Sequence, residues 1–432
     1  MKNNIIEFLE NKKILILGFG REGKAAYNFI KTNIKSCELG IADKKEIDLD
    51  DESVKIYSGD NYLTYTKDYD IVIKSPGVII KNYISEEEKQ KITSLTDLFL
   101  RFCKNIIIGV TGTKGKSTTS SLIYHILKEN NFDTYLIGNI GIPCFNIIDD
   151  IKEDTILVYE LSCHQLEFVK ASPNIAVLLN LYEEHLDQYI DINAYINAKS
   201  NIYKYQTKDD YLIYGDIWNY KEKKDLEEIL STKINLKDNP QNIDYDLIET
   251  SLIGEHNKEN IITALLATSI LGVTKESALE AVKSFKGLEH RLEYVGTFNK
   301  IKFYNDSIAT AQEAVIKAIE ALKDVDTIII GGMDRGIDYS VIVKYLSTSS
   351  VENIILLPST NERIIKLFNE FTHDKHLIPV NDMEEAVKVA YELTKENKTC
   401  LLSPAAASYG FYLNFEKRGQ HFKQLVKEYS NK

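Results

Sequence analysis

The chain has 432 residues, and at about 150 residues per domain this length predicts roughly three domains. With 44% hydrophobic and 27% charged residues, its composition is that of a soluble globular protein and excludes a chain that stays disordered. The 52 Lys and Arg residues against 64 Asp and Glu residues give a net charge of -12, which argues against a nucleic-acid partner.

Cysteine usage and apolar segments indicate a reducing compartment and no membrane segment. The five cysteines are widely spaced and form no CxxC pair, so neither a disulfide framework nor a thiolate zinc site is indicated. The N-terminus lacks the apolar core of a signal peptide, and the longest apolar stretch, 261–273, is too short to span a bilayer. We expect a cytoplasmic protein without a membrane partner, acting as a monomer.

Short runs of Ile, Val and Leu alternate with longer amphipathic segments along the chain. This alternation is typical of α/β units with parallel sheets buried on both faces. The clearest predicted strands are 13–17, 70–73, 105–110, 155–160, 175–180, 301–305, 327–330, 353–357 and 399–402. Because the series restarts near residues 104 and 295, we predict three α/β domains at 1–103, 104–295 and 296–432.

The first predicted strand runs into a glycine turn, 18–23 (GFGREG), and Asp43 follows a second apolar stretch. In a Rossmann-like unit such glycines let the backbone approach a diphosphate, and an acid about 20 residues on accepts from a ribose hydroxyl. The pattern therefore predicts a bound nucleotide diphosphate. NAD and a nucleotide sugar both fit it, and a glycine turn without a ligand is the remaining alternative.

The strand 105–110 enters a second loop, 111–119, with the sequence TGTKGKSTT. Successive backbone N–H groups before a helix cradle phosphate oxygens, while Lys116 can reach the terminal phosphates and Ser117 can ligate Mg²⁺. The strict GxxxxGK(S/T) spacing is not met, because Val110 stands at its first glycine. Two lysines and two glycines at a turn serve no core, so we interpret this segment as a phosphate loop.

Two phosphate-binding turns on successive units indicate two phosphorylated ligands brought together for a transfer. Polar residues also follow strand ends in the central unit, where open α/β sheets bind ligands: Glu160 after one strand and His185 after the next. A carboxylate and an imidazole there can hold Mg²⁺ directly or through water. The alternatives are that Glu160 caps a helix and that His185 is a structural histidine.

An ordered set of segments, covering essentially the whole chain, resembles the Mur ligases. These segments are TGTKGKSTT, GNIG (138–141), ELSCHQLE (160–167), NLYEEHLDQY (180–189), NAKSNIY (197–203), GEHNKENI (254–261), GLEHRLE (287–293), YNDS (304–307), GGMDRG (331–336) and LLSPAAAS (401–408) followed by NFEKRG (414–419). Within the family, SPG (75–77), ELSxxQLE and the C-terminal pair are most similar to the branch that adds D-glutamate to UDP-N-acetylmuramoyl-L-alanine.

The resemblance implies an ATP-dependent amide ligation in the synthesis of cell-wall peptidoglycan. ATP would phosphorylate the carboxylate of the UDP-sugar-linked alanine, and the amine of glutamate would attack the acyl phosphate. It also implies a Rossmann-like N-terminal domain for the UDP substrate, a central phosphate-loop ATPase domain and a Rossmann-like C-terminal domain for the amino acid. Two Mg²⁺ ions and a carbamylated Lys199 would serve the transfer, with an unmodified surface lysine as the alternative.

The roles of individual residues follow from the matching motif positions. For the UDP substrate the resemblance implies Gly18, Phe19, Gly20, Arg21, Asp43, Ser75, Pro76, Gly77 and Asn139. For ATP it implies Gly112, Thr113, Lys114, Gly115, Lys116, Ser117, Thr118, Asn257, Asn260, Arg291 and Asp306. Lys116, Glu160, His185 and Lys199 would be catalytic, and Ser117, Glu160, His185 and Lys199 would serve the metal ions.

For the incoming amino acid the resemblance implies Thr310, Arg335, Ser408 and Phe415. Arg335 keeps a positive charge for a carboxylate where the family pattern carries Lys. Ile308 and Ala311 depart from the pattern NDSKATN, so that one expected cation near the amino-acid site is missing. The departure leaves the ligase chemistry intact, but it opens L-glutamate or another amino acid as alternatives to D-glutamate.

Three other functions remain as alternatives. A related ligase with a different acceptor, such as folylpolyglutamate synthase, would offer the first glycine turn no diphosphate to bind. An NAD-dependent oxidoreductase would leave the second loop unexplained. A regulatory ATPase with a phosphate loop would turn over ATP without forming a ligation product.

Overall fold

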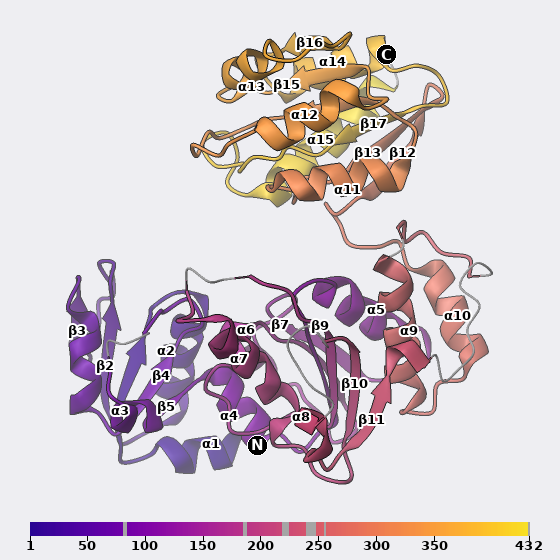
Figure 1. Ribbon diagram of the computed structural model, residues 1–432. Coiled ribbons are helices and arrows are strands. Elements are labelled where there is room, and N and C mark those ends of the chain that lie inside the picture. The colour runs from indigo at the N-terminus through magenta and orange to yellow at the C-terminus, as the bar shows by residue number, and fades with distance from the viewer. Residues whose placement is uncertain (81–83, 185–187, 218–223, 239–247, 255, 431–432) are drawn as a thin grey trace. The chain divides into compact units, whose positions relative to one another are not determined.

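The computed structural model describes residues 1–80, 84–184, 188–217, 224–238, 248–254 and 256–430. The chain forms two compact units, Met1–Thr250 with Glu255–Phe285 and Ser251–Gly254 with Lys286–Lys432 (Figure 1). The predicted metal residue His185 lies outside the described residues. Throughout the described ranges, every helix is too short or too polar to cross a lipid bilayer.

The first sheet is parallel throughout, with the strand order β3-β2-β1-β4-β5. Its strands are β1 (Lys13–Leu17), β2 (Glu38–Asp43), β3 (Lys55–Ser58), β4 (Ile71–Lys74) and β5 (Ile92–Thr93), accompanied by α1 (Lys2–Leu9), α2 (Arg21–Asn33), the 3-10 helix η1 (Tyr62–Asp68), α3 (Glu86–Gln90) and α4 (Leu95–Phe102). From β1 the chain adds β2 and β3 on one side of the sheet and then β4 and β5 on the other, so the strand order reverses between β1 and β4. Open α/β sheets bind their ligands outside the carboxyl ends of the strands at such a point.

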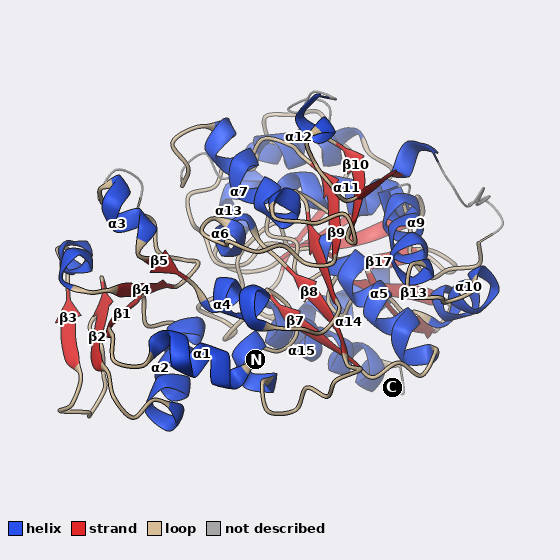
Figure 2. Ribbon diagram, turned by 90° about the horizontal axis from the view of Figure 1, so that it is seen from below, coloured by secondary structure: helices blue, strands red, loops and turns tan. Residues whose placement is uncertain are grey.

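The second sheet is also parallel, with the order β11-β10-β9-β6-β8-β7. Its elements are β6 (Ile107–Thr111), α5 (Lys116–Glu129), β7 (Thr134–Gly138), η2 (Cys144–Ile147), β8 (Ile156–Glu160), α6 (Cys163–Leu166), β9 (Ile175–Asn180), α7 (Ile192–Lys204), β10 (Tyr211–Asp216), α8 (Lys224–Glu227), β11 (Thr232–Asn235), η3 (Leu236–Asp238), α9 (His256–Ser269) and α10 (Lys275–Ser284). Helices α5, α9 and α10 pack together on one face, and α6 and α7 cover the other (Figure 2). The carboxyl ends of β6, β8 and β9 therefore meet at one edge.

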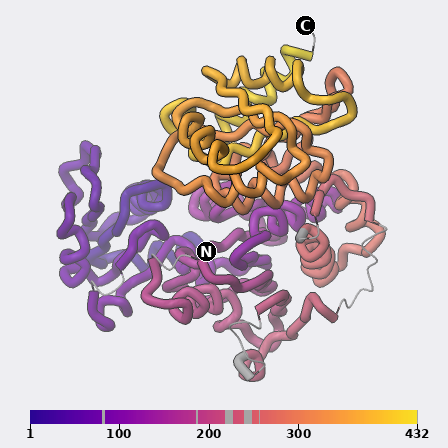
Figure 3. Tube along the Cα trace, turned by 45° about the horizontal axis from the view of Figure 1, so that its top comes forward, coloured from indigo at the N-terminus to yellow at the C-terminus, as the bar shows by residue number. Residues whose placement is uncertain are grey.

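The third sheet belongs to the second unit and has the order β12-β13-β17-β14-β15-β16. Its elements are β12 (Glu293–Phe298), β13 (Ile301–Asn305), α11 (Gln312–Leu322), β14 (Val325–Ile330), α12 (Ser340–Thr348), β15 (Asn353–Leu356), α13 (Asn361–Phe368), β16 (His376–Pro379), α14 (Met383–Leu393), β17 (Thr399–Leu402) and α15 (Phe415–Tyr429). Its course runs from orange to yellow in Figure 3. Helices α11, α12 and α13 form one core with the sheet, and α14 and α15 form another.

The predicted α/β class is confirmed, with parallel sheets buried on both faces. Every predicted strand overlaps an observed one, and four coincide at both ends with β1, β9, β13 and β17, namely 13–17, 175–180, 301–305 and 399–402. The strands β3, β11 and β16 lie at sheet edges and were not predicted, because their half-exposed residues form no continuous apolar run. The edge strand β12 pairs antiparallel with β13, which adds a hairpin to the expected parallel sheet.

One hydrophobic core joins the first sheet to the second. Ile14 and Ile16 of β1 belong to the same buried cluster as Leu157 and Tyr159 of β8. Helix α4 lies between the sheets: the rings of Phe99 and Tyr159 are 5.9 Å apart, edge to face. The two sheets therefore form one compact unit, and the domain boundary at 103 stays a prediction.

The glycine turn after β1 depends on a glycine in the first helical turn that follows it. A Cβ atom at Gly23 would lie 2.0 Å from the backbone oxygen of Gly18, so no larger residue fits while α2 starts where it does. Gly18 itself has φ +93°, and a Cβ there would lie 2.6 Å from Val78. The turn is therefore closed by direct backbone contact between a strand end and a helix.

We expect Gly23→Ala to destabilise the first unit by about 1–3 kcal/mol, because the added methyl group must push the turn and the helix apart. Gly20→Ala is the matched control, since nothing lies within 4 Å of a Cβ atom there. Thermal and urea unfolding of both variants measures the difference. Equal stability of the two variants would contradict the close approach.

Candidate nucleotide and amino-acid sites

Residues 112–115 of the phosphate loop join β6 to α5 in the centre of the second sheet. Gly112 has φ +155° and Gly115 has φ +88°, backbone conformations that favour glycine. A Cβ at Gly115 would lie 2.5 Å from Oδ1 of Asn260, so the loop passes directly against α9. Because helix N-termini carry free N–H groups, the start of α5 at Lys116 is suited to phosphate.

The end of β9 holds the phosphate loop in shape. The Asn180 side chain accepts from the Lys114 N–H at 2.9 Å and donates to the Lys114 oxygen at 3.1 Å. The Thr113 N–H donates to the Asn180 oxygen at 3.0 Å, and the Thr113 hydroxyl lies 2.9 Å from the Tyr195 hydroxyl of α7. The side chain of Lys114 extends outward to Glu184, at 2.6 Å.

Two lysines donate to the same carbonyl oxygen of the loop. Nζ of Lys116 donates to the oxygens of Gly112 and Thr113, both at 2.9 Å, and Nζ of Lys199 donates to the oxygen of Gly112 at 2.8 Å. Lys199 is only 2% exposed, and burial together with the neighbouring Lys116 ammonium lowers its pKa to about 7. Burial also lowers the pKa of Lys116. An uncharged lysine amine at neutral pH is therefore accessible at this position.

Glu160 at the end of β8 is a fully buried carboxylate with neutral hydrogen-bond partners. Oε1 accepts from the side-chain amide of Asn139 at 2.7 Å, and Oε2 lies 3.5 Å from the hydroxyl of Ser120. Ser117 stands in the first turn of α5. A buried carboxylate and a hydroxyl beside a phosphate loop are oxygen donors of the kind that Mg²⁺ prefers, so these residues fit the metal role.

The two asparagines of α9 that were predicted for ATP lie beside the loop. Oδ1 of Asn260 accepts from the hydroxyl of Thr119 at 3.1 Å, and its amide donates to Oδ1 of Asn257 at 2.8 Å. Both asparagines are buried. The remaining residues predicted for ATP, Arg291 and Asp306, belong to the second unit.

In the first sheet, the residues predicted for the UDP substrate form one connected turn. The Phe19 N–H donates to Oδ2 of Asp43 at 2.6 Å, and the Lys45 N–H donates to Oδ1 at 2.9 Å. The hydroxyl of Ser75, which follows β4, donates to the oxygen of Gly18 at 2.8 Å. Asp43 was predicted to receive a ribose hydroxyl, and its carboxylate already supports the glycine turn through the Phe19 N–H.

The glycine turn also contacts the second sheet. Nη2 of Arg21 donates to the oxygen of Gly138 at 3.0 Å, directly before Asn139. Next to it, the Gln165 amide donates to Oε1 of Glu22 at 3.0 Å, and buried Lys74 lies 3.2 Å from Glu167. The predicted UDP residues of the first sheet and Asn139 of the second therefore lie at one edge of the first unit.

In the second unit, Asp306 follows β13 and is 6% exposed. Oδ1 accepts from the Leu292 N–H at 3.1 Å, and Oδ2 accepts from the hydroxyl of Ser403 at 2.8 Å. Burial raises the pKa of Asp306 to about 6. Arg291, which precedes Leu292, is exposed. The Asp306 carboxylate therefore ties the segment 290–292 to the end of β13, and the guanidinium of Arg291 stays on the surface.

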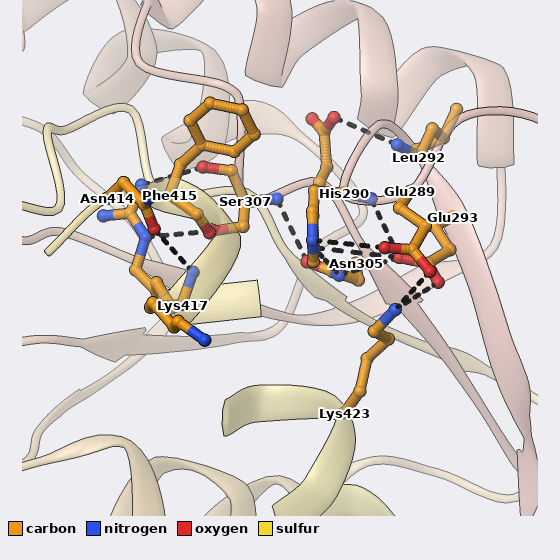
Figure 4. A network of polar contacts seen from close by, with 12 residues as sticks. Glu289, His290, Leu292, Glu293, Asn305, Ser307, Asn414, Phe415, Lys417 and Lys423 are labelled. Atoms are coloured by element: carbon orange, nitrogen blue, oxygen red, sulfur yellow. Dashed lines mark hydrogen bonds and ion pairs between the residues drawn. The ribbon is translucent and has the colours of Figure 1, made fainter. Parts of the chain in front are cut away.

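A polar network holds this segment against α15 (Figure 4). The N–H of buried His290 donates to Oε2 of Glu293 at 2.8 Å, and its Nδ1 lies 2.9 Å from the amide of Asn305. Glu293 also pairs with Lys423 of α15 at 2.7 Å. A Cβ at Gly419 would lie 2.2 Å from Nδ1 of His290, which explains the glycine of NFEKRG.

The four residues predicted for the amino acid differ in exposure. Thr310 and Arg335 are exposed, and Ser408 is buried. The backbone oxygen of Phe415, the first residue of α15, accepts from the hydroxyl of Ser307 at 2.9 Å. Ser408 lines a pocket of about 240 Å³ at the carboxyl ends of the strands.

The two departures from the family pattern have local structural consequences. The backbone N–H of Ile308 donates to the His290 oxygen at 3.1 Å, and its side chain is half-buried. Ala311 occupies the N-cap position of α11 and makes no side-chain cap hydrogen bond. An Asn in the family pattern could supply that cap, which is worth about 1 kcal/mol.

Sequence reasoning missed two residues that the geometry makes prominent. Asn180 holds the phosphate loop on both sides, and its position at the end of a predicted strand was the available signal. Arg418 of NFEKRG is buried at 1% exposure, although an arginine is rarely buried without a partner. The motif was visible in the sequence, but nothing in it shows which way a side chain of α15 points.

A phosphate loop at the centre of a parallel sheet defines a nucleotide-binding α/β protein, and two family models narrow that class. The Mur ligase middle domain matches residues 110–268, and the Mur ligase glutamate ligase domain matches residues 290–406. The UDP-N-acetylmuramoylalanine--D-glutamate ligases of Clostridium kluyveri and Staphylococcus saprophyticus are each 33% identical, over 98% and 96% of both chains respectively. The UDP-N-acetylmuramate-alanine ligase of Thermotoga maritima shares the fold, with a TM-score of 0.58 at 18% identity over 98% of this chain and 100% of that one.

The chain therefore belongs to the Mur ligase family. It is an ATP-dependent ligase that forms amide bonds in the synthesis of peptidoglycan precursors.

We expect Asn180→Ala to raise the KM for ATP about tenfold, because two hydrogen bonds that shape the loop are lost together. Asn130→Ala is the matched control: it lies at the other end of α5 and also makes side-chain hydrogen bonds, to Ile126 and Ser277. Steady-state kinetics in ATP measures both variants. An unchanged KM in Asn180→Ala, or an equal rise in the control, would refute the role of Asn180.

Proposed function

We propose that this ligase adds D-glutamate to the carboxylate of UDP-N-acetylmuramoyl-L-alanine through an acyl phosphate. The observation that carries the proposal is the full-length likeness to relatives named for this reaction, at 33% identity over 96–98% of the chain. A glutamate ligase domain matched at residues 290–406 supports the same amino acid. The second candidate is L-glutamate or another amino acid, which the departures from the family pattern at Ile308 and Ala311 leave open.

The UDP end of the acceptor would bind at the glycine turn. Backbone N–H groups at the start of α2 can receive the diphosphate, and the contacts of Asp43 and Ser75 keep the turn rigid. Arg21 brings a cation to the edge where Asn139 holds Glu160. A line of contacts thus supports the path from the nucleotide to the transfer centre, all within the first unit.

ATP would bind at residues 112–118, with Asn257 and Asn260 beside the loop. The ATP roles of Arg291 and Asp306 rest on the sequence motifs alone. Bound Mg²⁺ would neutralise the charge that develops on the transferred phosphoryl group. Glu160 and Ser117 offer oxygen ligands for it, and the ammonium of Lys116 can move from the loop carbonyls to a terminal phosphate. The role of His185 rests on the sequence motif alone.

We also propose that Lys199 is carbamylated. Carbamate formation needs an uncharged amine, and burial lowers the pKa of this lysine to about 7. The carbamate would replace a second cation beside Gly112 by an anion able to hold a second Mg²⁺. The modification therefore removes a repulsion between two lysines and adds a metal ligand.

The setting of the reaction is part of the same proposal. We propose three functional domains at 1–103, 104–295 and 296–432, each with its own sheet and its own substrate. The protein would act as a monomer in the cytoplasm, on small-molecule substrates and without a nucleic-acid or membrane partner. A net charge of -12 supports the absence of a nucleic-acid partner.

The substrate assignment predicts phosphate release from ATP that depends on both UDP-N-acetylmuramoyl-L-alanine and D-glutamate, with a product heavier by one glutamate residue. L-glutamate and reactions without an amino acid are the controls, and mass spectrometry identifies the product. If product forms with L-glutamate or another amino acid instead, the assignment of D-glutamate is wrong, while the ligase chemistry of the family stands. Acceptor-independent ATP turnover without any product would refute the proposed ligation.

The lysine proposal predicts that Lys199→Arg lowers kcat about a hundredfold or more, because arginine keeps the charge but cannot form a carbamate. Lys204→Arg, an exposed position on the same helix, is the matched control. Wild-type activity should rise as the pH passes upward through about 7, where the amine loses its proton. A carbamate signal in the ¹³C NMR spectrum with labelled bicarbonate should be present in the wild type and absent in Lys199→Arg. A fully active wild type without that signal would exclude carbamylation.

A further inference from the structure

The loop between β14 and α12, residues 331–339, carries two carboxylates close to Arg335 in the chain. Asp334 directly precedes Arg335, and Asp338 follows it by three residues. Arg335 is exposed, and within the described residues no ion pair involves its guanidinium. An unpaired guanidinium between two carboxylates needs an explanation, because opposite charges close together attract each other. The explanation is that both carboxylates have other partners.

Arg363 of α13 is the partner of Asp334. Its Nη1 pairs with Oδ1 of Asp334, and its Nη2 donates to the oxygen of Ile337 at 2.9 Å. The guanidinium carbon lies 5.8 Å from the ring centroid of buried Tyr339. The hydrogen bond from Arg363 lowers the pKa of Asp334, so this carboxylate is charged at neutral pH. Arg363 therefore neutralises a carboxylate whose neighbour in the chain is Arg335.

The second carboxylate of the loop is held by the helix that follows it. Oδ1 of Asp338 accepts from the Ser340 N–H at 2.9 Å, and Oδ2 accepts from the Ser340 hydroxyl at 2.7 Å. Ser340 begins α12, and the N-terminus of a helix offsets part of a negative charge. Of the two carboxylates, Asp334 is therefore the one that depends on a cation.

The backbone of the loop is held by the turn before α13. The hydroxyl of buried Thr360 accepts from the Gly332 N–H at 3.2 Å, and the Ser359 hydroxyl accepts from the Asp334 N–H at 3.3 Å. Oδ1 of Asp334 accepts from the Gly336 N–H at 2.9 Å. These bonds are made without a cation, so we expect the loop to keep its conformation when the charge on α13 is removed.

We propose that Arg363 is a positioning residue that pairs with Asp334, so that the guanidinium of Arg335 stays available for a carboxylate of the incoming amino acid. Without Arg363, Asp334 would pair with Arg335 and compete with the substrate. Arginine suits both positions, because its planar group forms paired hydrogen bonds with oxygen acceptors. The inference rests on the proposed function and adds to it a residue that none of the recognised motifs contains.

The kinetic test removes the charge of Arg363 and then that of Asp334. Arg363→Gln should raise the KM for the amino acid about fivefold and leave the KM for ATP unchanged. Adding Asp334→Asn should return the KM to within about twofold of the wild type, because the competing charge is gone while Oδ1 still accepts from the Gly336 N–H. Lys366→Gln, at an exposed cation of the same helix, is the matched control. Equal KM values in Arg363→Gln and in the double variant would overturn the proposal.

Arg363→Lys separates the charge of Arg363 from its hydrogen bonds. Lysine keeps a cation for Asp334 but loses the fixed pair of donors, so the KM should stay near the wild-type value. A rise equal to that in Arg363→Gln would mean that Arg363 only holds the backbone at Ile337, which would also overturn the proposal. Thermal unfolding of each variant checks that it folds.

Chemical modification tests the pairing without relying on the ligase reaction. Phenylglyoxal attacks unpaired guanidinium groups, and peptide mass spectrometry measures its rate at Arg335. The rate should fall in Arg363→Gln and recover in the double variant, and an unchanged rate would overturn the proposal. A wild type that forms no ligation product with any amino acid would instead overturn the proposed function, while the modification rates would still decide the pairing of Asp334.

Discussion

Two lysine ammonium groups donate to one carbonyl oxygen, that of Gly112, and much of the first unit follows from this arrangement. Burial lowers the pKa values of both lysines, and the neighbouring Lys116 ammonium lowers that of Lys199 further. The site becomes more stable if a phosphate attracts Lys116 away or if Lys199 loses its charge. Glu160, buried without an ion pair among the described residues, supplies a third group that lacks its final partner. The charges of these three groups are therefore not balanced by neighbouring groups, which suits the centre to a charged substrate.

The sequence predicted the parts of this centre that lie on short local motifs. The phosphate loop, the glycine turn and the strand end carrying Glu160 could be predicted because glycine spacing and strand ends are local signals. What could not be predicted is which groups pair across the chain. The Asp43 carboxylate accepts a hydrogen bond from a backbone N–H of the glycine turn, and the Asn180 side chain hydrogen-bonds to the phosphate loop from a neighbouring strand. These pairings depend on the order of the strands in the sheet, which cannot be read from the sequence.

The second unit shows the same limit for a buried charge. NFEKRG was recognisable as a motif, yet its letters do not distinguish a surface arginine from Arg418, which holds the turns after β13 and β17 together. Gly419 and Gly332 are examples of contacts that the motifs do not reveal. Gly419 lacks a side chain where His290 lies close, and Gly332 lacks one where Arg418 lies close. The glycines of these motifs therefore record contacts made by other residues, and only the fold reveals which ones.

The core shared by the first and second sheets also constrains how this chain can vary. Phe99 and Tyr159 meet between the sheets, and the Tyr159 hydroxyl lies 3.1 Å from that of Thr96. A change on one side of this wall alters the packing on the other, so substitutions there should be coupled. An N-terminal segment transplanted from a relative would have to pack against side chains of β8 that are shaped to fit the α4 of this chain. A functional chimaera would therefore have to carry α4 together with the residues of β8 that it contacts.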